Sequence, residues 1–203
     1  MIGIVDYNMG NLASVINAFN SLGVDAKVES NPSKLKEYDK LILPGVGAFG
    51  DAMEHLKENN MDKAIIEYAK SRKPLLGICL GMQLLFESSN EFGEHKGLGL
   101  IEGKVEAFNE KAFDHPLKVP HIGWNELFIQ KENPLFKDLE DEFYLYFVHS
   151  FHIKCDDKYT IGKTHYGYKF VSAVNKDNIY GIQPHPEKSH KNGLKIIENF
   201  INL

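Results

Sequence analysis

The residues best suited to covalent chemistry are a cysteine and, much later in the chain, a histidine and a glutamate. The cysteine ends a short apolar run and has glycines two positions away on each side, in the order Gly77-Ile78-Cys79-Leu80-Gly81. Helical spacing starts directly after it, so the pattern predicts a nucleophile elbow, a sharp turn from strand to helix that exposes its apex side chain. The amino end of that helix favours an anion, and therefore a reactive thiolate at Cys79. The alternative is a buried, inert cysteine in a Gly-rich turn.

The histidine and the glutamate lie in the segment Gln183-Pro184-His185-Pro186-Glu187. Residues two apart share a face of an extended segment, and Pro186 favours that conformation, so the imidazole and the carboxylate can point the same way. Such a pair can activate a thiol, because the imidazole takes its proton and later protonates a leaving amine, while the carboxylate orients the ring. Alone, these residues are also compatible with an exposed polar turn. Together with the elbow they indicate thiol catalysis.

A Gly-rich stretch at 44–47 follows a predicted strand at 40–43. It lacks the Lys-Ser/Thr of a phosphate-binding loop and the glycine spacing of a dinucleotide-binding turn. Its backbone N–H groups, together with that of Leu80, could instead face a developing oxyanion. A plain turn explains this stretch equally well.

Length, composition and charge narrow the class of protein. The 203 residues with 43% hydrophobic content are enough for one domain with a full core, spanning 1–203. A net charge of -5 gives no electrostatic footprint for nucleic acid or an anionic membrane. The two cysteines, Cys79 and Cys155, provide neither a disulfide framework nor zinc-ligand spacing. With no signal peptide and no membrane span in view, we expect a cytoplasmic protein without metal or cofactor.

Strands and helices alternate in the first half of the chain, which predicts crossover connections and a mainly parallel sheet. After residue 98 the period changes to two, which predicts antiparallel strands. The expected fold is therefore α/β, a central mainly parallel sheet flanked by helices with an antiparallel β extension. We expect early strands at 2–5, 24–29, 40–43 and 75–78. We expect helices at 12–22, from residue 32, from a cap at Asp51, at 61–71 and from Leu80, followed by a polar loop at 88–97. Later strands are expected at 102–108, 120–129, 142–152, 159–166, 170–176 and 178–183, with a hairpin turn at 175–178 and a last helix capped by Ser189.

The elbow and the His185-Pro186-Glu187 segment resemble the class I, triad-type glutamine amidotransferases. Five further stretches narrow the resemblance to the glutaminase subunits of imidazole glycerol phosphate synthases, at 8–12, 44–47, 120–126, 147–150 and 185–189. The resemblance covers nearly the whole chain and implies one type 1 glutamine amidotransferase domain, 1–203, with a flavodoxin-like fold. In such a domain Cys79 attacks the side-chain amide of glutamine, His185 serves as base and acid, and Glu187 orients the histidine.

The resemblance also implies a partner and further site residues. L-Glutamine is hydrolysed to glutamate and ammonia, and the ammonia passes through a tunnel in a (β/α)₈-barrel cyclase subunit, bound as a heterodimer. That subunit makes imidazole glycerol phosphate and an aminoimidazole carboxamide ribotide in histidine biosynthesis. By position, the resemblance assigns the oxyanion N–H groups to Val46 and Leu80, and the contacts with glutamine to Gly47, Gln83, Glu91, Ser150 and Phe151. The residues that would lie towards the partner are Asn11, Trp124, Asn125, Tyr146 and Lys188. Trp124 and Tyr146 could instead be ordinary core aromatics, and Lys188 a solvated surface charge.

The chain departs from the family pattern at two positions. Pro184 stands where an aromatic residue usually precedes the catalytic histidine, and Phe151 replaces the more usual tyrosine. Other functions also remain open. The segments 92–99 and 188–191 resemble paralogous subunits that supply ammonia for amidino-group formation on cell-surface sugars. More distant alternatives are a γ-glutamyl hydrolase that acts alone and a catalytically silent binding subunit.

Overall fold

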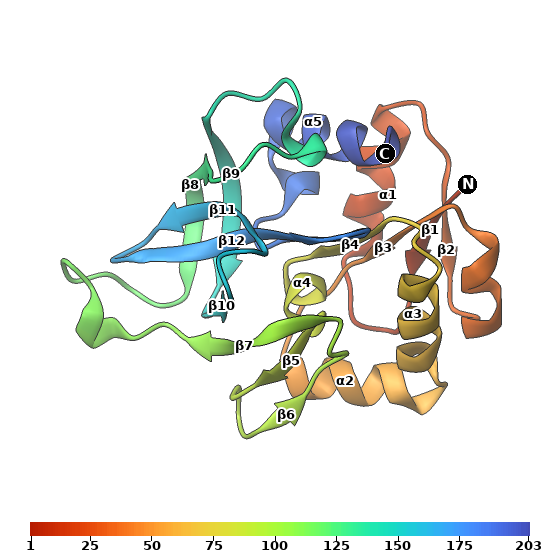
Figure 1. Cartoon of the computed structure of the whole chain (residues 1–203), viewed down its shortest axis with the longest axis horizontal. Helices are drawn as coiled ribbons and strands as arrows, with labels where there is room; N and C mark the ends of the chain where they lie inside the picture. Colours follow the sequence, from red (N-terminus) through yellow and green to blue (C-terminus); the bar gives the residue numbers. More distant parts are fainter.

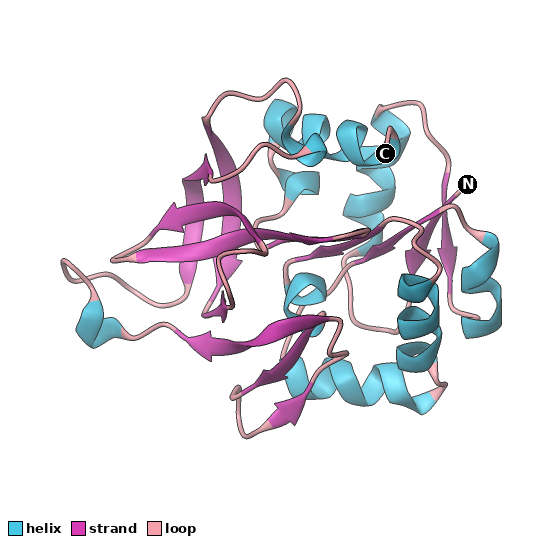
Figure 2. Cartoon of the chain, viewed as in Figure 1, coloured by secondary structure: helices cyan, strands magenta, loops and turns pink.

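The computed structural model describes residues 1–203, and its thirteen strands form a single sheet with helices on both faces (Figures 1 and 2). Four short 3₁₀ helices complete the chain, at Pro32–Glu37, Glu110–Ala112, Pro134–Phe136 and Pro186–Lys188. The helices are α1 (Leu12–Ser21), α2 (Phe49–Glu58), α3 (Met61–Lys70), α4 (Leu80–Leu84) and α5 (His190–Ile201). The strands are β1 (Ile2–Val5), β2 (Ala26–Glu29), β3 (Lys40–Leu43), β4 (Leu75–Ile78), β5 (Phe86–Ser89), β6 (His95–Lys96), β7 (Ile101–Ala107), β8 (His121–Ile129), β9 (Glu142–His149), β10 (Phe151–Lys154), β11 (Thr160–His165), β12 (Lys169–Lys176) and β13 (Ile179–Ile182).

The centre of the sheet is parallel, in the order β2-β1-β3-β4-β13. Strands β1, β4 and β13 are buried along their whole length, as expected for parallel strands covered on both faces. Helices α1 and α5 pack on one face and α2 and α3 on the other (Figure 1). Beyond β13 the strands run antiparallel, through β12, β11, β8 and β9. The predicted α/β fold class is confirmed.

Two expectations about the antiparallel region are wrong. The polar loop expected at 88–97 contains a hairpin, in which β5 and β6 pair through Ser88 and Lys96. The single strand expected at 142–152 is interrupted at Ser150, because β9 pairs with β8 whereas β10 pairs with β7 and β12. The change of partner bends the chain at this serine, and that bend lies beside the site described below.

The expected cap of α2 is also wrong. Asp51 lies within the first turn of the helix, which begins at Phe49. The N–H of Phe49 donates instead to the Glu91 carboxylate, at 2.8 Å. A residue 42 positions away therefore satisfies one of the free N–H groups of this helix terminus.

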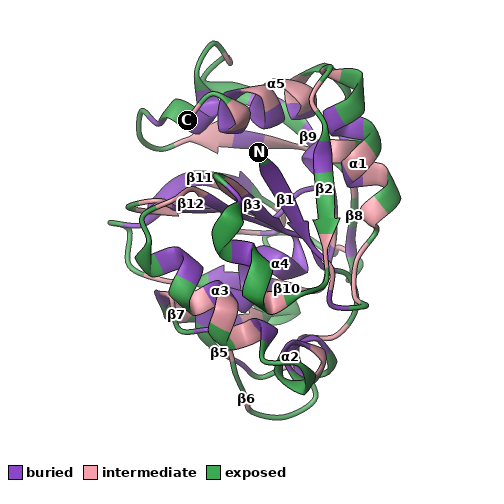
Figure 3. Ribbon diagram, turned by 90° about the vertical axis from the view of Figure 1, so that its right-hand side faces the viewer, coloured by how far each residue is buried: buried purple, intermediate pink, exposed green.

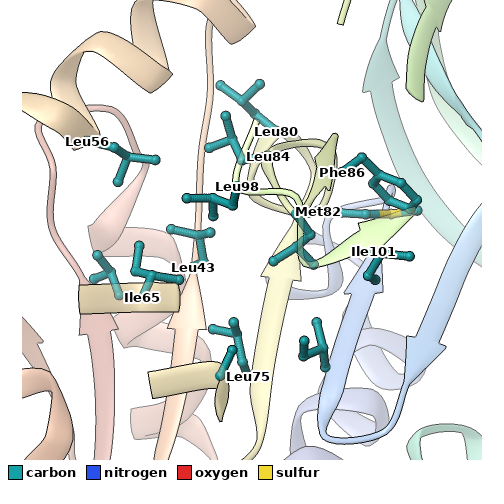
Figure 4. Packing of buried hydrophobic residues seen from close by; sticks show 14 of the residues in the cluster. Leu43, Leu56, Ile65, Leu75, Leu80, Met82, Leu84, Phe86, Leu98 and Ile101 are labelled. Atoms are coloured by element: carbon teal, nitrogen blue, oxygen red, sulfur yellow. The ribbon is translucent and has the colours of Figure 1, made fainter. Parts of the chain in front are cut away.

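The helix after the elbow is held by apolar packing. Leu80, Met82 and Leu84 of α4 lie among buried side chains of β3, β4, α2 and α3 (Figure 4). The longer helices turn their buried faces to the sheet and their exposed faces outward (Figure 3). Burying each such leucine or methionine contributes about 1.5–3 kcal/mol. None of the helices combines the length and the apolar character needed to cross a bilayer.

Candidate active site

The turn at Cys79 has the geometry of a nucleophile elbow. Cys79 joins β4 to α4 with φ 54° and ψ -114°, a conformation that is strained for any residue with a side chain. Its backbone N–H donates to the carbonyl of Ile182, at 2.8 Å, which fixes the turn to β13. A Cβ on Gly81 would lie 1.8 Å from the carbonyl oxygen of Leu43, and one on Gly77 would lie 2.6 Å from that of Gly81. Both glycines are thus required by close packing rather than by positive φ.

His185 and Glu187 form a buried pair directly after β13. Nδ1 of the ring lies 2.6 Å from Oε1 of the carboxylate, and the two side chains are only 3% and 2% exposed. Burial lowers the pKa of His185, but Cys79 and Glu187 outweigh it and raise this pKa to about 10. Nε2 has no hydrogen-bond partner of normal geometry. Contacts of this kind are often long in resting enzymes and tighten when substrate binds.

The segment that carries His185 is fixed to β9. The N–H of His185 donates to the carbonyl of Tyr146 at 2.9 Å, and the Ser189 hydroxyl accepts from the N–H of Tyr146 and donates to the carbonyl of His185. Ser189 occupies the expected N-cap position of α5. Because its hydroxyl is engaged in these two bonds, its side chain does not cap the helix. Pro184 lies beyond the end of β13 at Ile182, so its missing N–H removes no bond of the strand.

A pocket of about 400 Å³ contains both the elbow and the histidine. This volume suits a ligand the size of an amino acid. Glu187 lies behind His185 and does not line the pocket. The lining residues include all those expected to act on glutamine or to bind it, namely Val46, Gly47, Cys79, Leu80, Gln83, Glu91, Ser150, Phe151 and His185. Three further lining residues were not expected: Pro120, Val148 and His149.

Glu91 is the carboxylate of the pocket wall. Burial raises its pKa, and the hydrogen bond from the N–H of Phe49 partly offsets this effect. The stretch 44–47, of which Val46 and Gly47 also line the pocket, is attached to the body of the fold by Tyr7, whose hydroxyl donates to the carbonyl of Pro44 at 2.8 Å. Gly47 in this stretch has φ 102°, which only glycine adopts readily. The pocket thus combines a thiol, a histidine, one carboxylate and a Gly-rich backbone.

Of the residues expected to lie towards a partner, Asn11, Trp124 and Lys188 are exposed, whereas Asn125 and Tyr146 are half-buried. Trp124 of β8 pairs with Tyr146 of β9, is 47% exposed and stacks on the ring of His190, with the ring centroids 5.2 Å apart. Lys188 is exposed. Asn11 is exposed too, and its side chain accepts from the N–H of Ser14 at the start of α1.

Asn125 lies on the opposite face of β8 from Trp124 and begins a buried polar chain. Its amide Nδ2 lies 3.1 Å from Nε2 of His121, whose Nδ1 lies 3.0 Å from Nε2 of His149. Nδ1 of His149 in turn lies 2.7 Å from the carbonyl oxygen of Phe151. Because that oxygen can only accept, Nδ1 of His149 carries the proton, and each link then donates in the same direction. The chain requires both histidines to be neutral.

We predict that the protein loses stability in acid before its carboxylates titrate. Burial lowers the pKa of His121 to about 4 and that of His149 to about 3, and it also lowers the pKa of His152. As the pH falls below about 6.5, the unfolded chain binds protons that the folded protein does not, so the free energy of unfolding decreases. Each such histidine adds up to about 1.4 kcal/mol per pH unit to this slope. Urea unfolding measured between pH 4.5 and 7.5 checks this predicted decrease in the free energy of unfolding.

The matched variants are His121→Phe and His115→Asn. Phenylalanine keeps the stacking of His121 on Phe147 and Tyr166 but cannot titrate, so the acid slope should become shallower even though the variant is less stable at neutral pH. His115 is exposed, and its replacement should leave the slope unchanged. Equal slopes in the wild type and both variants would show that His121 does not contribute to the acid dependence of stability.

A larger hollow of about 990 Å³ lies between β9 and α5. Its walls carry charges of both signs, including Glu142, Lys195 and Glu198. None of Cys79, His185 and Glu187 lines it. The chemistry of the chain is therefore concentrated in the smaller pocket.

Sequence reasoning missed the residues that pack directly against the thiol. Sγ of Cys79 lies 3.9 Å from the carbonyl oxygen of Val148 and 3.7 Å from Nε2 of Gln183. The signal for Gln183 was present, because it stands two residues before His185 and so on the same side of an extended segment. His149 gives a weaker signal, as the buried member of an alternating strand.

Comparison with known proteins shows one consistent relationship. A family model described as "Glutamine amidotransferase class-I" matches residues 3–203. The imidazole glycerol phosphate synthase subunit HisH of Sulfurimonas denitrificans is 70% identical over 201 residues, which cover 98% of this chain and 97% of that protein. The protein of the same name from Wolinella succinogenes is 57% identical over 204 residues, with both chains fully covered.

Solved structures share the fold at much lower identity. The structure of PurLQS from Thermotoga maritima has a TM-score of 0.78 with 21% sequence identity, and the match covers 99% of this chain and 97% of that chain. A crystal structure described as a glutamine amidotransferase has a TM-score of 0.76 with 18% identity. At these identities the likeness concerns the fold alone.

Proposed function

The chain belongs to the class-I glutamine amidotransferase family, and we propose that it is the glutaminase subunit of an imidazole glycerol phosphate synthase, acting in histidine biosynthesis. The observation that carries this proposal is the pocket shared by the elbow thiol and His185, whose ring is held from behind by the buried carboxylate of Glu187. The full-length identity to HisH subunits supports the specific pathway.

The pocket supports a two-step hydrolysis of glutamine. The Cys79 thiolate attacks the side-chain carboxamide carbon, and His185 protonates the nitrogen that leaves as ammonia. Water then attacks the thioester and gives one proton to His185. The C–S bond breaks, glutamate is released with its carboxyl proton lost to solvent, and the Cys79 thiolate beside protonated His185 is restored. Glu187 keeps the imidazole oriented throughout, through its 2.6 Å contact with Nδ1.

The other pocket residues are assigned supporting roles. The N–H groups of Val46 and Leu80 are proposed to bind the oxyanion of each tetrahedral intermediate. The Glu91 carboxylate suits the α-ammonium group of glutamine, since it is the acidic side chain of the pocket wall. Gly47, Gln83, Ser150 and Phe151 complete the proposed contacts with substrate.

The proposed partner surface is the outer face of the β8–β9 hairpin. Ile122, Trp124 and Tyr144 are exposed there, at 59%, 47% and 53%. Ile122 pairs with Val148, whose carbonyl oxygen lies 3.9 Å from the thiol. Exposed apolar side chains that extend from the pocket are well placed for a subunit that receives ammonia, and we propose a (β/α)₈-barrel cyclase subunit bound there as a heterodimer.

Glutamate release from glutamine tests the proposal, measured with the chain alone and then with the barrel cyclase and its ribonucleotide ligand. We expect the rate of glutamate release by the complex to exceed that of the isolated chain by at least about 100-fold, because binding of the partner would bring the active site into its catalytically competent conformation. Trp124→Ala should weaken both the complex and the stimulation. Val28→Ala, which alters an exposed residue of the edge strand β2, should change neither.

Two outcomes would overturn the assignment. Full activity of the isolated chain, without stimulation by the barrel subunit, would indicate a hydrolase that acts alone. Activity only with a sugar-modifying partner would move the chain to the paralogous group of ammonia donors.

A further inference from the structure

Gln183 is a completely buried polar residue for which the two-step hydrolysis has no role. Strands β4 and β13 run parallel with Ile78 opposite Ile182, so the next residues along each strand, Cys79 and Gln183, also meet. The side-chain Nε2 of Gln183 lies 3.7 Å from Sγ of Cys79. An amide thus contacts the proposed nucleophile from the side of β13.

The orientation of this amide follows from its neighbours. Nε2 of Gln83 lies 3.3 Å from the carbonyl oxygen of Phe151 and 3.0 Å from Oε1 of Gln183. Because a backbone carbonyl only accepts, the group of Gln83 that faces it must be the NH₂. That NH₂ only donates, so it must meet the oxygen of Gln183, which leaves the NH₂ of Gln183 for the sulfur. Reversing either amide would place two donors or two acceptors in contact.

The carbonyl that sets this orientation is itself held from a second direction. His149 donates to the same oxygen of Phe151 through Nδ1, at 2.7 Å. The oxygen has two lone pairs, and the two buried donors use both. Phe151 is therefore the common end of two polar chains, one through the histidines and the other through Gln83 and Gln183 to Cys79.

The sulfur is contacted by one donor and one acceptor. The thiol can donate to the carbonyl of Val148, at 3.9 Å, while it accepts from Gln183. After ionisation the sulfur can only accept, so the contact with Val148 becomes unfavourable and the contact with Gln183 becomes charge-assisted. A donor whose direction is already set favours the thiolate without reorganisation.

We propose that Gln183 is a positioning residue for the nucleophile, whose side-chain NH₂ binds Sγ of Cys79 and stabilises its thiolate. The inference deepens the proposed glutaminase function, and it assigns Gln183 no contact with glutamine. Its effect should therefore appear in the formation of the thiolate and in kcat, with little change in the binding of substrate.

The experiment measures the rate of Cys79 alkylation by iodoacetamide against pH in the full chain, with the modified cysteine identified by mass spectrometry. Gln183→Glu has the same shape but puts a carboxylate beside the sulfur, and Gln183→Met removes the donor without adding charge. We expect the midpoint of alkylation to rise by about 1–2 pH units in Gln183→Glu and by less in Gln183→Met. If the glutamate variant does not fold, the methionine variant decides alone.

Kinetics of the complex supply the second readout. We expect kcat for glutamine to fall about 10- to 100-fold in Gln183→Glu, with KM changed less than about threefold. Gln130→Glu, an exposed glutamine changed in the same way, should match the wild type in both measurements. Alkylation midpoints equal to that of the wild type would overturn the proposal, even if kcat fell. Because alkylation needs neither glutamine nor the partner, it tests Gln183 even if the proposed function is wrong.

Discussion

Glutamine-dependent turnover of the complex is expected to fall by at least about 10⁴-fold when Cys79 is replaced by alanine. The variant retains the pocket and the His185–Glu187 pair but lacks the atom that would form the thioester. Turnover with added ammonia should remain at the wild-type level, because ammonia from solution reaches the partner without the glutaminase reaction. Both rates are measured on the assembled complex, with glutamine or an ammonium salt as the nitrogen source.

Cys155→Ala is the matched control for this experiment. Cys155 is the other cysteine of the chain, half-buried and close to the hydroxyl of Thr160, and it lies outside the pocket. Its replacement should leave both activities unchanged. Loss of both activities in Cys79→Ala would mean that Cys79 has a structural role. Equal losses of glutamine-dependent turnover in Cys79→Ala and Cys155→Ala would show that Cys79 has no special role in catalysis.

The parts of the fold that follow local rules could be predicted from the sequence. The elbow is one, because glycines on both sides of a cysteine between strand and helix patterns leave few other conformations. The hairpin between β12 and β13 is another, since the expected turn contains Asp177 with φ 51°. The break at Ser150 was not predictable in this way, because β9 and β10 both alternate and only their different partners separate them.

The candidate site shows the same division. Cys79, His185 and Glu187 carry recognisable chemistry at recognisable spacing, so they could be proposed before any coordinates. The family resemblance also indicated Glu91 as a pocket residue, but not its contact with the N–H of Phe49 at the start of α2. Gln183 was not proposed, because its contact with the thiol depends on the β4–β13 register. Hydrophobic periodicity describes which face of an element is buried, but not which buried polar atom meets another.

Gly81→Ala is expected to lower the free energy of unfolding by at least about 3 kcal/mol, or to prevent folding. The new methyl group would lie 1.8 Å from the carbonyl oxygen of Leu43, a distance that no side-chain rotation can relieve. Either α4 or the end of β3 must move, and α4 is a short helix packed tightly in the core. Urea unfolding of the purified chain measures the loss.

Gly23→Ala separates this effect from backbone strain. Gly23 has φ 72° and no atom within 4 Å of its hypothetical Cβ, so alanine there should cost only about 1 kcal/mol. Equal losses of stability at both positions would show that α4 can shift freely.

The stretch 44–47 begins directly after Leu43, and a Cβ on Gly45 would lie 3.0 Å from the N atom of Gly81. The contact that Gly81 permits therefore holds the proposed oxyanion stretch against the elbow, so any folded Gly81→Ala protein should also lose glutaminase activity, whereas Gly23→Ala should keep it.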